Sequence, residues 1–162
     1  MEISIRRAKP NDCSILTDIS LKAKRYWNYP EEYYEIWKDE LTIREEYIKN
    51  NTVYVAEHGE RIVGYYSIIQ VEEDFWAGKV FVMKGYWLEH IFILPEYIGK
   101  GIGSRLIEHA KSVCCDMGCK SLFIFSDPHA RGFYERIGAK FIRESPSSIE
   151  GRIIPVFEMD IF

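Results

Sequence analysis

The apolar and polar positions of this 162-residue chain follow two periods, and the period changes several times along the sequence. Runs that are wholly apolar or alternate with a period of two predict strands at 3–9, 53–57, 61–72, 86–94, 122–125, 140–144 and 154–161. Apolar residues at three- and four-residue steps predict a helix after Asp12 and another from Ile102. Pro30, followed by two glutamates, marks the start of a further helix, and residues 129–137 are expected to form a fourth. Because no linker is long enough to divide the chain, we expect a single domain over residues 1–162.

The segment 86–125 is predicted to be a strand, a loop, a helix and a second strand. Pro95 ends the first strand because proline cannot donate to a ladder, and Gly118 follows the helix as a left-handed cap. The apolar face of this helix is predicted to consist of Ile102, Leu106, Ala110, Val113 and Met117. Since a strand, a helix and a strand follow one another, the two strands should be parallel, with a right-handed crossover.

The other strands are predicted to pair in antiparallel fashion. Residues 53–57 and 61–72 form a predicted hairpin with its turn at 58–60, and Gly64 inside the second strand predicts a bulge or a close backbone approach. The stretch 73–85 is predicted to be a looser connection with a turn at Ala77 and Gly78. The two last strands are joined by a predicted loop at 145–148.

Three alternating glycines, Gly99, Gly101 and Gly103, separate the strand 86–94 from its helix. Without Cβ atoms this loop lets a ligand approach the backbone, and the N–H groups and dipole of the helix N-terminus favour a phosphate or pyrophosphate. Lys100 and Arg105 add positive charge. The pattern fits neither a P-loop nor a dinucleotide fingerprint. Close packing of strand against helix is the alternative explanation of the glycines.

Two segments in this order resemble motifs of the GNAT superfamily of acyl-CoA-dependent N-acyltransferases. Residues 92–104 are similar to its acetyl-CoA-binding motif, Arg or Gln, two residues, Gly, one residue, then Gly or Ala. Here Ile98 stands at the Arg/Gln position. Residues 127–139 resemble the Asn-x-x-Ala-x-x-Phe-Tyr-x-x-x-Gly-Phe segment, with Asp127 in place of Asn and Ala139 in place of Phe. The remaining positions of that second motif agree, namely Ala130, Phe133, Tyr134 and Gly138.

The resemblance implies an α/β (α+β) fold. Its central sheet of six to seven strands is mainly antiparallel, contains a central parallel pair and is flanked by about four helices. It also implies an N-acetyltransferase that uses acetyl-CoA as co-substrate without a metal. The residues implied in cofactor binding are Ile91, Phe92, Ile93, Ile98, Gly99, Lys100, Gly101, Ile102, Gly103, Ser104, Asp127, Ala130, Phe133 and Tyr134.

Three residues are candidates for the chemistry. Glu89 and His90 interrupt an apolar strand, and alternation should place them on opposite faces. A partly desolvated Glu89 would suit a general base, and the family often uses a carboxylate on this strand, whereas His90 is expected to be structural. Asp127 is the competing base, although a helix cap is its favoured role. The resemblance implies that Tyr134 is the general acid to the departing thiolate.

The acceptor is expected to meet an aromatic segment over residues 26–37. Its rings can cover the edge of the sheet or form a lid over the acceptor. The candidate acceptor-binding residues are Tyr26, Trp27, Tyr29, Tyr33 and Glu89. Two alternatives to an enzyme are open: a non-catalytic CoA-binding sensor, and a protein that binds another phosphorylated ligand through the glycine loop.

Composition and charge restrict the kinds of partner that we expect for this chain. The net charge is −4 and no basic stripe is present, which argues against nucleic acid. No transmembrane run or secretory signal is evident, so we expect a cytoplasmic protein without a membrane partner. Four cysteines lack zinc spacing, and Cys114 should be a buried, reduced thiol. The expected partner is a small-molecule or peptide amine, and the family resemblance allows a homodimer.

Overall fold

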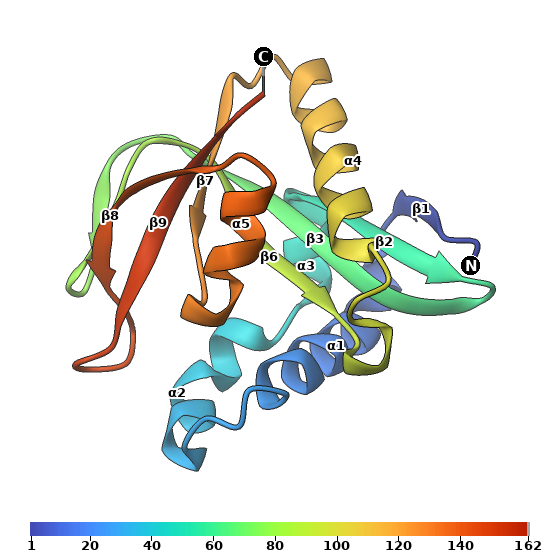
Figure 1. The fold of residues 1–162 in the computed structure, drawn as a ribbon, viewed down its shortest axis with the longest axis horizontal. Coiled ribbons are helices and arrows are strands. Elements are labelled where there is room, and N and C mark those ends of the chain that lie inside the picture. Colours follow the sequence, from blue (N-terminus) through green and yellow to red (C-terminus); the bar gives the residue numbers. More distant parts are fainter. Residues whose placement is uncertain (162) are drawn as a thin grey trace. The chain divides into compact units, whose positions relative to one another are not determined.

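A computed structural model describes residues 1–161 of the chain, which form two compact units. The first unit contains Met1–Ile68 and His90–His109, and the second contains Ile69–Glu89 and the chain from Ala110 onward. Strands of both units belong to one seven-stranded sheet in the order β1-β2-β3-β6-β7-β9-β8 (Figure 1). The strands are β1 (Ser4–Arg7), β2 (Thr52–His58), β3 (Arg61–Val71), β6 (Gly85–Ile93), β7 (Ser121–Phe125), β8 (Lys140–Pro146) and β9 (Ile153–Asp160).

The only parallel pair among the described strand pairings is β6 with β7, where Tyr86 lies opposite Leu122. The pairs β1–β2, β2–β3, β7–β9 and β8–β9 are antiparallel. The predicted sheet of six to seven strands with one parallel pair is therefore confirmed. The helix between the two parallel strands is α4 (Ile102–Asp116), and Gly118 ends it with a φ of +74°.

In the first unit, helices cover both faces of the β2–β3 strands. On one face lies α1 (Cys13–Arg25), because the Ser20 hydroxyl is 2.6 Å from the Tyr65 hydroxyl of β3. The next residue of β3, Tyr66, points to the other face, where its hydroxyl is 2.8 Å from Nδ1 of His109 on α4. Two further helices belong to this unit, α2 (Glu31–Leu41) and α3 (Glu45–Asn50).

Gly64 brings β3 close to β6. A Cβ atom built there would lie 2.8 Å from Cδ1 of Ile93 and 3.0 Å from the carbonyl oxygen of Phe92. The register of the β2–β3 pair shifts next to this glycine, between Ala56 and Glu57. Both consequences predicted for Gly64, a bulge and a close approach, are therefore confirmed.

The core of the second unit lies around Trp87. Its ring is 2% exposed and stacks on Phe125 at 4.5 Å, with Val71 and Val156 beside it. The hairpin β4 (Phe75–Ala77) and β5 (Val80–Val82) forms a separate two-stranded sheet, and α5 (Arg131–Arg136) follows β7.

Four local predictions need correction. The connection 73–85 is not loose, since it contains β4 and β5, although its turn falls at Gly78 as predicted. The short helix α3 was not predicted. β8 continues through Ser145 and Pro146, which pair with β9, so the loop begins later than expected. Met117 is 37% exposed, and Cys114 occupies the buried end of the α4 face instead.

An ion-pair network connects β1 of the first unit to the residues that follow it and to β2. Arg6 contacts Asp12 at 3.0 Å and Glu57 at 3.2 Å, and the Asp12 side chain is only 11% exposed. Burial alone would raise the pKa of Asp12. The hydrogen bonds from Arg6 and from the Lys9 amide, together with the charge of Arg6, outweigh it and lower that pKa.

Because the folded-state pKa of Asp12 is lowered, its stabilisation is present above the ordinary value of about 3.9 and is lost as pH falls through the folded value. We expect Asp12→Asn to cost about 1–3 kcal/mol of unfolding free energy at pH 7, and less at pH 3. Urea titrations at both pH values measure this. The matched control is Asp18→Asn, which breaks an exposed pair with Lys22 and should cost under about 1 kcal/mol. An equal cost at both pH values would contradict the assignment.

Candidate active site

The glycine loop of the first unit presents backbone amides rather than side chains. After the single 3₁₀ turn Pro95–Tyr97, the first helical hydrogen bond of α4 runs from the Arg105 amide to the Gly101 carbonyl at 3.2 Å. Within residues 1–161, no amide between positions 99 and 104 donates to another group of the chain. These donors sit at the positive end of a fifteen-residue helix, which suits a negatively charged ligand.

The backbone conformation of the loop requires glycine. Gly99 and Gly101 have φ values of +81° and +78°, which place both in the left-handed region. A Cβ atom at either position would meet nothing within 4 Å, so the loop surface is open rather than filled by side chains. Close packing of strand against helix, the alternative explanation, does not account for these two glycines. Ile98, which is 47% exposed, adds no polar group to this surface.

The β2–β3 turn supports the loop from one side. Arg61 forms an ion pair with Glu96 at 3.0 Å, and the His58 ring nitrogen is 2.9 Å from the Tyr97 hydroxyl. The guanidinium of Arg105 donates to the Ile3 carbonyl at 2.8 Å. Arg105 therefore anchors the N-terminal strand, whereas Lys100 is the exposed cation of the loop itself.

On β6 the environments of Glu89 and His90 differ from the prediction. Glu89 is exposed, so the partial desolvation expected of it is not found. Burial falls on His90 instead and lowers its pKa to about 4, with a smaller contribution from the charge of Lys24. The His90 ring packs near Tyr65 and Phe92, and its amide donates to Ser67. The structural role predicted for His90 agrees with these contacts.

In the second unit, Asp127 is a cap. Its carboxylate accepts hydrogen bonds from the His129 amide at 2.9 Å and lies 3.0 Å from the His129 ring and 3.4 Å from Arg152. It begins the 3₁₀ turn Pro128–Ala130 at the end of β7. The favoured interpretation of Asp127 is thus confirmed, and these contacts occupy the oxygens that a general base would need.

Tyr134 is a buried phenol. It is 4% exposed, and its ring lies 5.3 Å from that of Phe133 and 5.7 Å from that of Phe157. Burial, and to a smaller extent the negative charge of Asp127, raise the pKa of Tyr134 above its ordinary value. The hydroxyl therefore keeps its proton at every physiological pH.

The aromatic segment of the first unit divides into two groups. Tyr26 and Trp27 are 51% and 41% exposed and contact each other edge to face at 4.9 Å. Tyr29 and Tyr33 instead pack against Trp37, with ring centroids 5.1 Å and 5.5 Å away. Part of the segment is therefore packed and part is exposed, and the role of the exposed rings as a lid over the acceptor stays a prediction.

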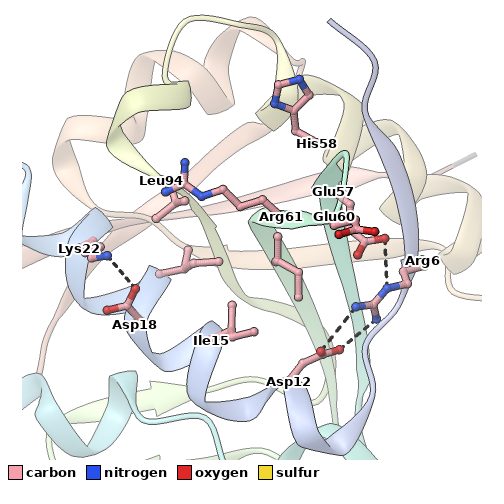
Figure 2. Close-up of a pocket in the computed structure, with 12 residues that line it drawn as sticks. Arg6, Asp12, Ile15, Asp18, Lys22, Glu57, His58, Glu60, Arg61 and Leu94 are labelled. Carbon is pink, nitrogen blue, oxygen red and sulfur yellow. Dashed lines mark hydrogen bonds and ion pairs between the residues drawn. The ribbon is translucent and has the colours of Figure 1, made fainter.

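A pocket that sequence reasoning missed lies in the first unit (Figure 2). Its volume is about 710 Å³, and its apolar floor is formed by Ile15, Ile19, Ile62 and Leu94. Around it Figure 2 shows Lys22 beside Asp18 and Arg6 between acidic side chains. None of the predicted site residues lines this pocket. Its residues come from β1, from residues 12–22, from the β2–β3 hairpin and from Leu94 after β6, and no motif marks that combination in the sequence.

The described residues offer neither a metal site nor a membrane-spanning helix. Across residues 1–161, no set of three His, Cys, Asp or Glu side chains is arranged to hold a metal ion. No helix in that range is long and apolar enough to span a bilayer. Cys114 is buried as predicted, and burial raises the pKa of its thiol to about 12, with smaller contributions from Cys119.

The sheet is mainly antiparallel with one parallel pair, and a glycine loop precedes the helix between those two strands. These are the features of the acetyltransferase fold that the sequence resemblance predicts. The family model described as Acetyltransferase (GNAT) family matches residues 21–139, which is more than half of the chain. The chain therefore belongs to the GNAT acetyltransferase family.

Relatives and solved structures agree with this assignment. A thialysine N-epsilon-acetyltransferase from Bos taurus is 29% identical over 88% of this chain and 87% of its own. The PaiA N-acetyltransferase from Thermoplasma acidophilum, solved with coenzyme A, has a TM-score of 0.76 at 19% identity, covering 99% of both chains. A GNAT family acetyltransferase from Brucella melitensis, solved with acetyl-CoA, has a TM-score of 0.63 at 24% identity, covering 94% and 95%. These two structures show that the fold is shared.

Proposed function

We propose that this protein is an N-acetyltransferase that transfers the acetyl group of acetyl-CoA to a primary amine. One observation carries the proposal: in a chain of the GNAT family, the backbone N–H groups at positions 99–104 donate no hydrogen bond to another group of the chain. Neighbours of the same fold were solved with coenzyme A or acetyl-CoA, which supports the choice of co-substrate.

The chemistry of the loop fits the diphosphate of coenzyme A. Backbone N–H groups and a helix dipole are donors suited to phosphate oxygens, and Lys100 adds one positive charge. Ile98 stands where the family motif has Arg or Gln and supplies no donor. Binding of the diphosphate therefore depends on the backbone amides that Gly99 and Gly101 expose.

The proposed reaction is direct. The amine nitrogen attacks the thioester carbonyl carbon, the carbon–sulfur bond breaks, and the acetyl group becomes the acyl part of an amide. Glu89 takes the amine proton, directly or through water, and the Tyr134 hydroxyl donates a hydrogen bond to the departing sulfur. Amides near Phe92 and Ile93 hold the pantetheine arm. No cysteine nucleophile is required, and the raised pKa of the Cys114 thiol makes it unreactive.

The acceptor is proposed to be a small molecule with a primary amine. The relative from Bos taurus acts on thialysine, so an amino acid with a side-chain amine is the first acceptor to test. The exposed rings of Tyr26 and Trp27 and the exposed Glu89 are the groups that such an acceptor would meet.

Thiol release in the presence of acetyl-CoA and a panel of amines tests the function. We expect release with at least one primary amine and an acetylated product of the matching mass. Binding of acetyl-CoA in calorimetry without thiol release from any amine would instead support a CoA sensor. Competition by ATP, with no binding of CoA, would overturn the proposal in favour of another phosphorylated ligand.

Gly101→Val should weaken acetyl-CoA binding by at least about 10- to 100-fold, measured by calorimetry. A β-branched residue is strained at a φ of +78°, and relieving the strain turns the amides of the loop away from the diphosphate. The matched control is Gly118→Val at the other end of α4, where φ is +74° and space is equally open. Both variants should lose stability, and only the first should lose affinity. Equal affinities would place the diphosphate elsewhere.

A further inference from the structure

The pocket beside Arg6 lies wholly in the first unit, because each of its twelve lining residues belongs to that unit. Its volume of about 710 Å³ is within the range of roughly 300–1,000 Å³ that is usual for sites of small molecules. None of the residues proposed to bind acetyl-CoA or the acceptor lines it. The pocket is therefore a candidate for a second ligand site.

The floor of this pocket extends the hydrophobic core of the first unit to the surface. Ile19, Ile62 and Leu94 are only 1%, 7% and 3% exposed, whereas Ile15 is 46% exposed. Ile15 precedes Ile19 by four residues of α1, so the two side chains share one helix face. A ligand that covers Ile15 removes apolar surface from water. The floor therefore favours a ligand with an aliphatic part.

The charged groups at one end of the pocket leave an excess of carboxylates. Arg6 is shared by two of them, since it contacts Asp12 at 3.0 Å and Glu57 at 3.2 Å. Glu60, at the β2–β3 turn, has no hydrogen-bond or ion-pair partner among residues 1–161. Because one guanidinium faces two carboxylates and a third carboxylate is unpaired, this end of the pocket is negatively charged.

The other two cations of the pocket already have partners. Lys22 forms an ion pair with Asp18 at 2.9 Å, and Arg61 forms one with Glu96 at 3.0 Å. An anionic ligand would have to compete with these carboxylates for either cation. The unmatched charge of the pocket is therefore negative, and it suits a cationic ligand.

We propose that this pocket binds an aliphatic amine in its protonated form. Figure 2 shows Glu57 and Glu60 on one side of Ile15 and the Lys22–Asp18 pair on the other. The ammonium group of the ligand contacts Glu60 at the negative end, and the aliphatic chain extends over Ile15. A carboxylate ligand with the same chain is repelled at that end and binds more weakly.

Titration of hexylamine into the protein tests the proposal, and it needs no acetyl-CoA because binding here requires no turnover. Hexanoate and hexanol are the matched probes, since they carry the same chain with a negative charge or none. Calorimetry should show that hexylamine binds at least about ten times more tightly than hexanoate, with hexanol between them. Equal affinities of hexylamine and hexanoate, or no saturation by hexylamine below about 10 mM, would overturn the proposal.

The isoleucine methyl groups report where hexylamine binds. In protein with ¹³C-labelled isoleucine methyls, assigned through single Ile→Val variants, the resonances of Ile15, Ile19 and Ile62 should shift during the titration. Those of Ile36 on α2 and of Ile98 beside the glycine loop should stay in place, because neither residue lines the pocket. Shifts confined to isoleucines outside the pocket would overturn the proposal.

Two variants test the two parts of the ligand. Glu60→Gln removes the unpaired carboxylate and Ile15→Ala removes exposed apolar surface, so each should weaken hexylamine binding about 3- to 10-fold. Both side chains are exposed, and neither change should unfold the protein. The matched controls are Glu46→Gln on α3 and Ile36→Ala on α2, which should keep the wild-type affinity. Equal losses in a variant and its control would overturn the proposal.

Discussion

Tyr134→Phe is expected to lower kcat by about 10²- to 10³-fold while the affinity for acetyl-CoA changes less than about threefold. The substitution removes one hydroxyl from a ring that is 4% exposed, and phenylalanine fills the same space. Single-turnover thiol release measures the rate, and calorimetry measures the affinity. An unchanged rate would remove Tyr134 from the reaction.

The raised pKa of Tyr134 defines what its hydroxyl can do. A thiol has an ordinary pKa of about 8.5 and a phenol about 10, and burial raises the pKa of Tyr134 further. Complete proton transfer from this phenol to a thiolate would be uphill by more than about 2 kcal/mol. Tyr134 is therefore best suited to donating a hydrogen bond to the developing thiolate. Because the folded-state pKa is raised, the donor stays protonated, and kcat should show no alkaline decline below about pH 10.

Tyr66→Phe is the matched control for this experiment. It also removes a hydroxyl from a fully buried tyrosine, one whose oxygen is 2.8 Å from His109. The loss of that hydrogen bond should cost about 0.5–1.5 kcal/mol of unfolding free energy without a comparable loss of kcat. A similar fall in kcat for both variants would indicate that a general loosening, not the position of the Tyr134 hydroxyl, slows the reaction.

The central strand, the glycine loop and the parallel pair could be predicted because each has a local cause. A mostly apolar run predicts a central strand, Pro95 ends it, and left-handed backbone at positions 99 and 101 requires glycine. The α3 helix and the β4–β5 hairpin could not be predicted in the same way. Each is too short to show a period, and tertiary contacts decide its conformation.

The environments of single residues were harder to predict than the elements. Alternation separates Glu89 from His90, but it does not say which face receives a covering layer, and the layer covers His90. The pocket beside Arg6 is lined by four separated segments of the chain, so no local sequence pattern predicts it.

Glu89→Gln should have the other large effect, a fall in kcat/KM of about 10²- to 10⁴-fold at pH 7. An alkylammonium with a pKa near that of lysine, about 10.4, is almost entirely protonated at pH 7 and cannot attack. The exposed Glu89 carboxylate can accept its proton directly or through water. His90 is a poorer candidate, since a group with a pKa of about 4 binds a proton weakly at neutral pH.

The pH dependence of kcat/KM tests whether Glu89 is the general base. Raising the pH deprotonates the free amine without help, so the deficit of Glu89→Gln relative to the wild type should shrink towards about pH 10. Glu46→Gln, at an exposed position of α3, should match the wild type throughout. A deficit that is constant with pH would show that Glu89 positions the acceptor and takes no proton. If Glu89→Gln keeps the wild-type pH dependence of kcat/KM, the general base is another group. Asp127 could act as that base only after breaking its contacts with His129 and Arg152.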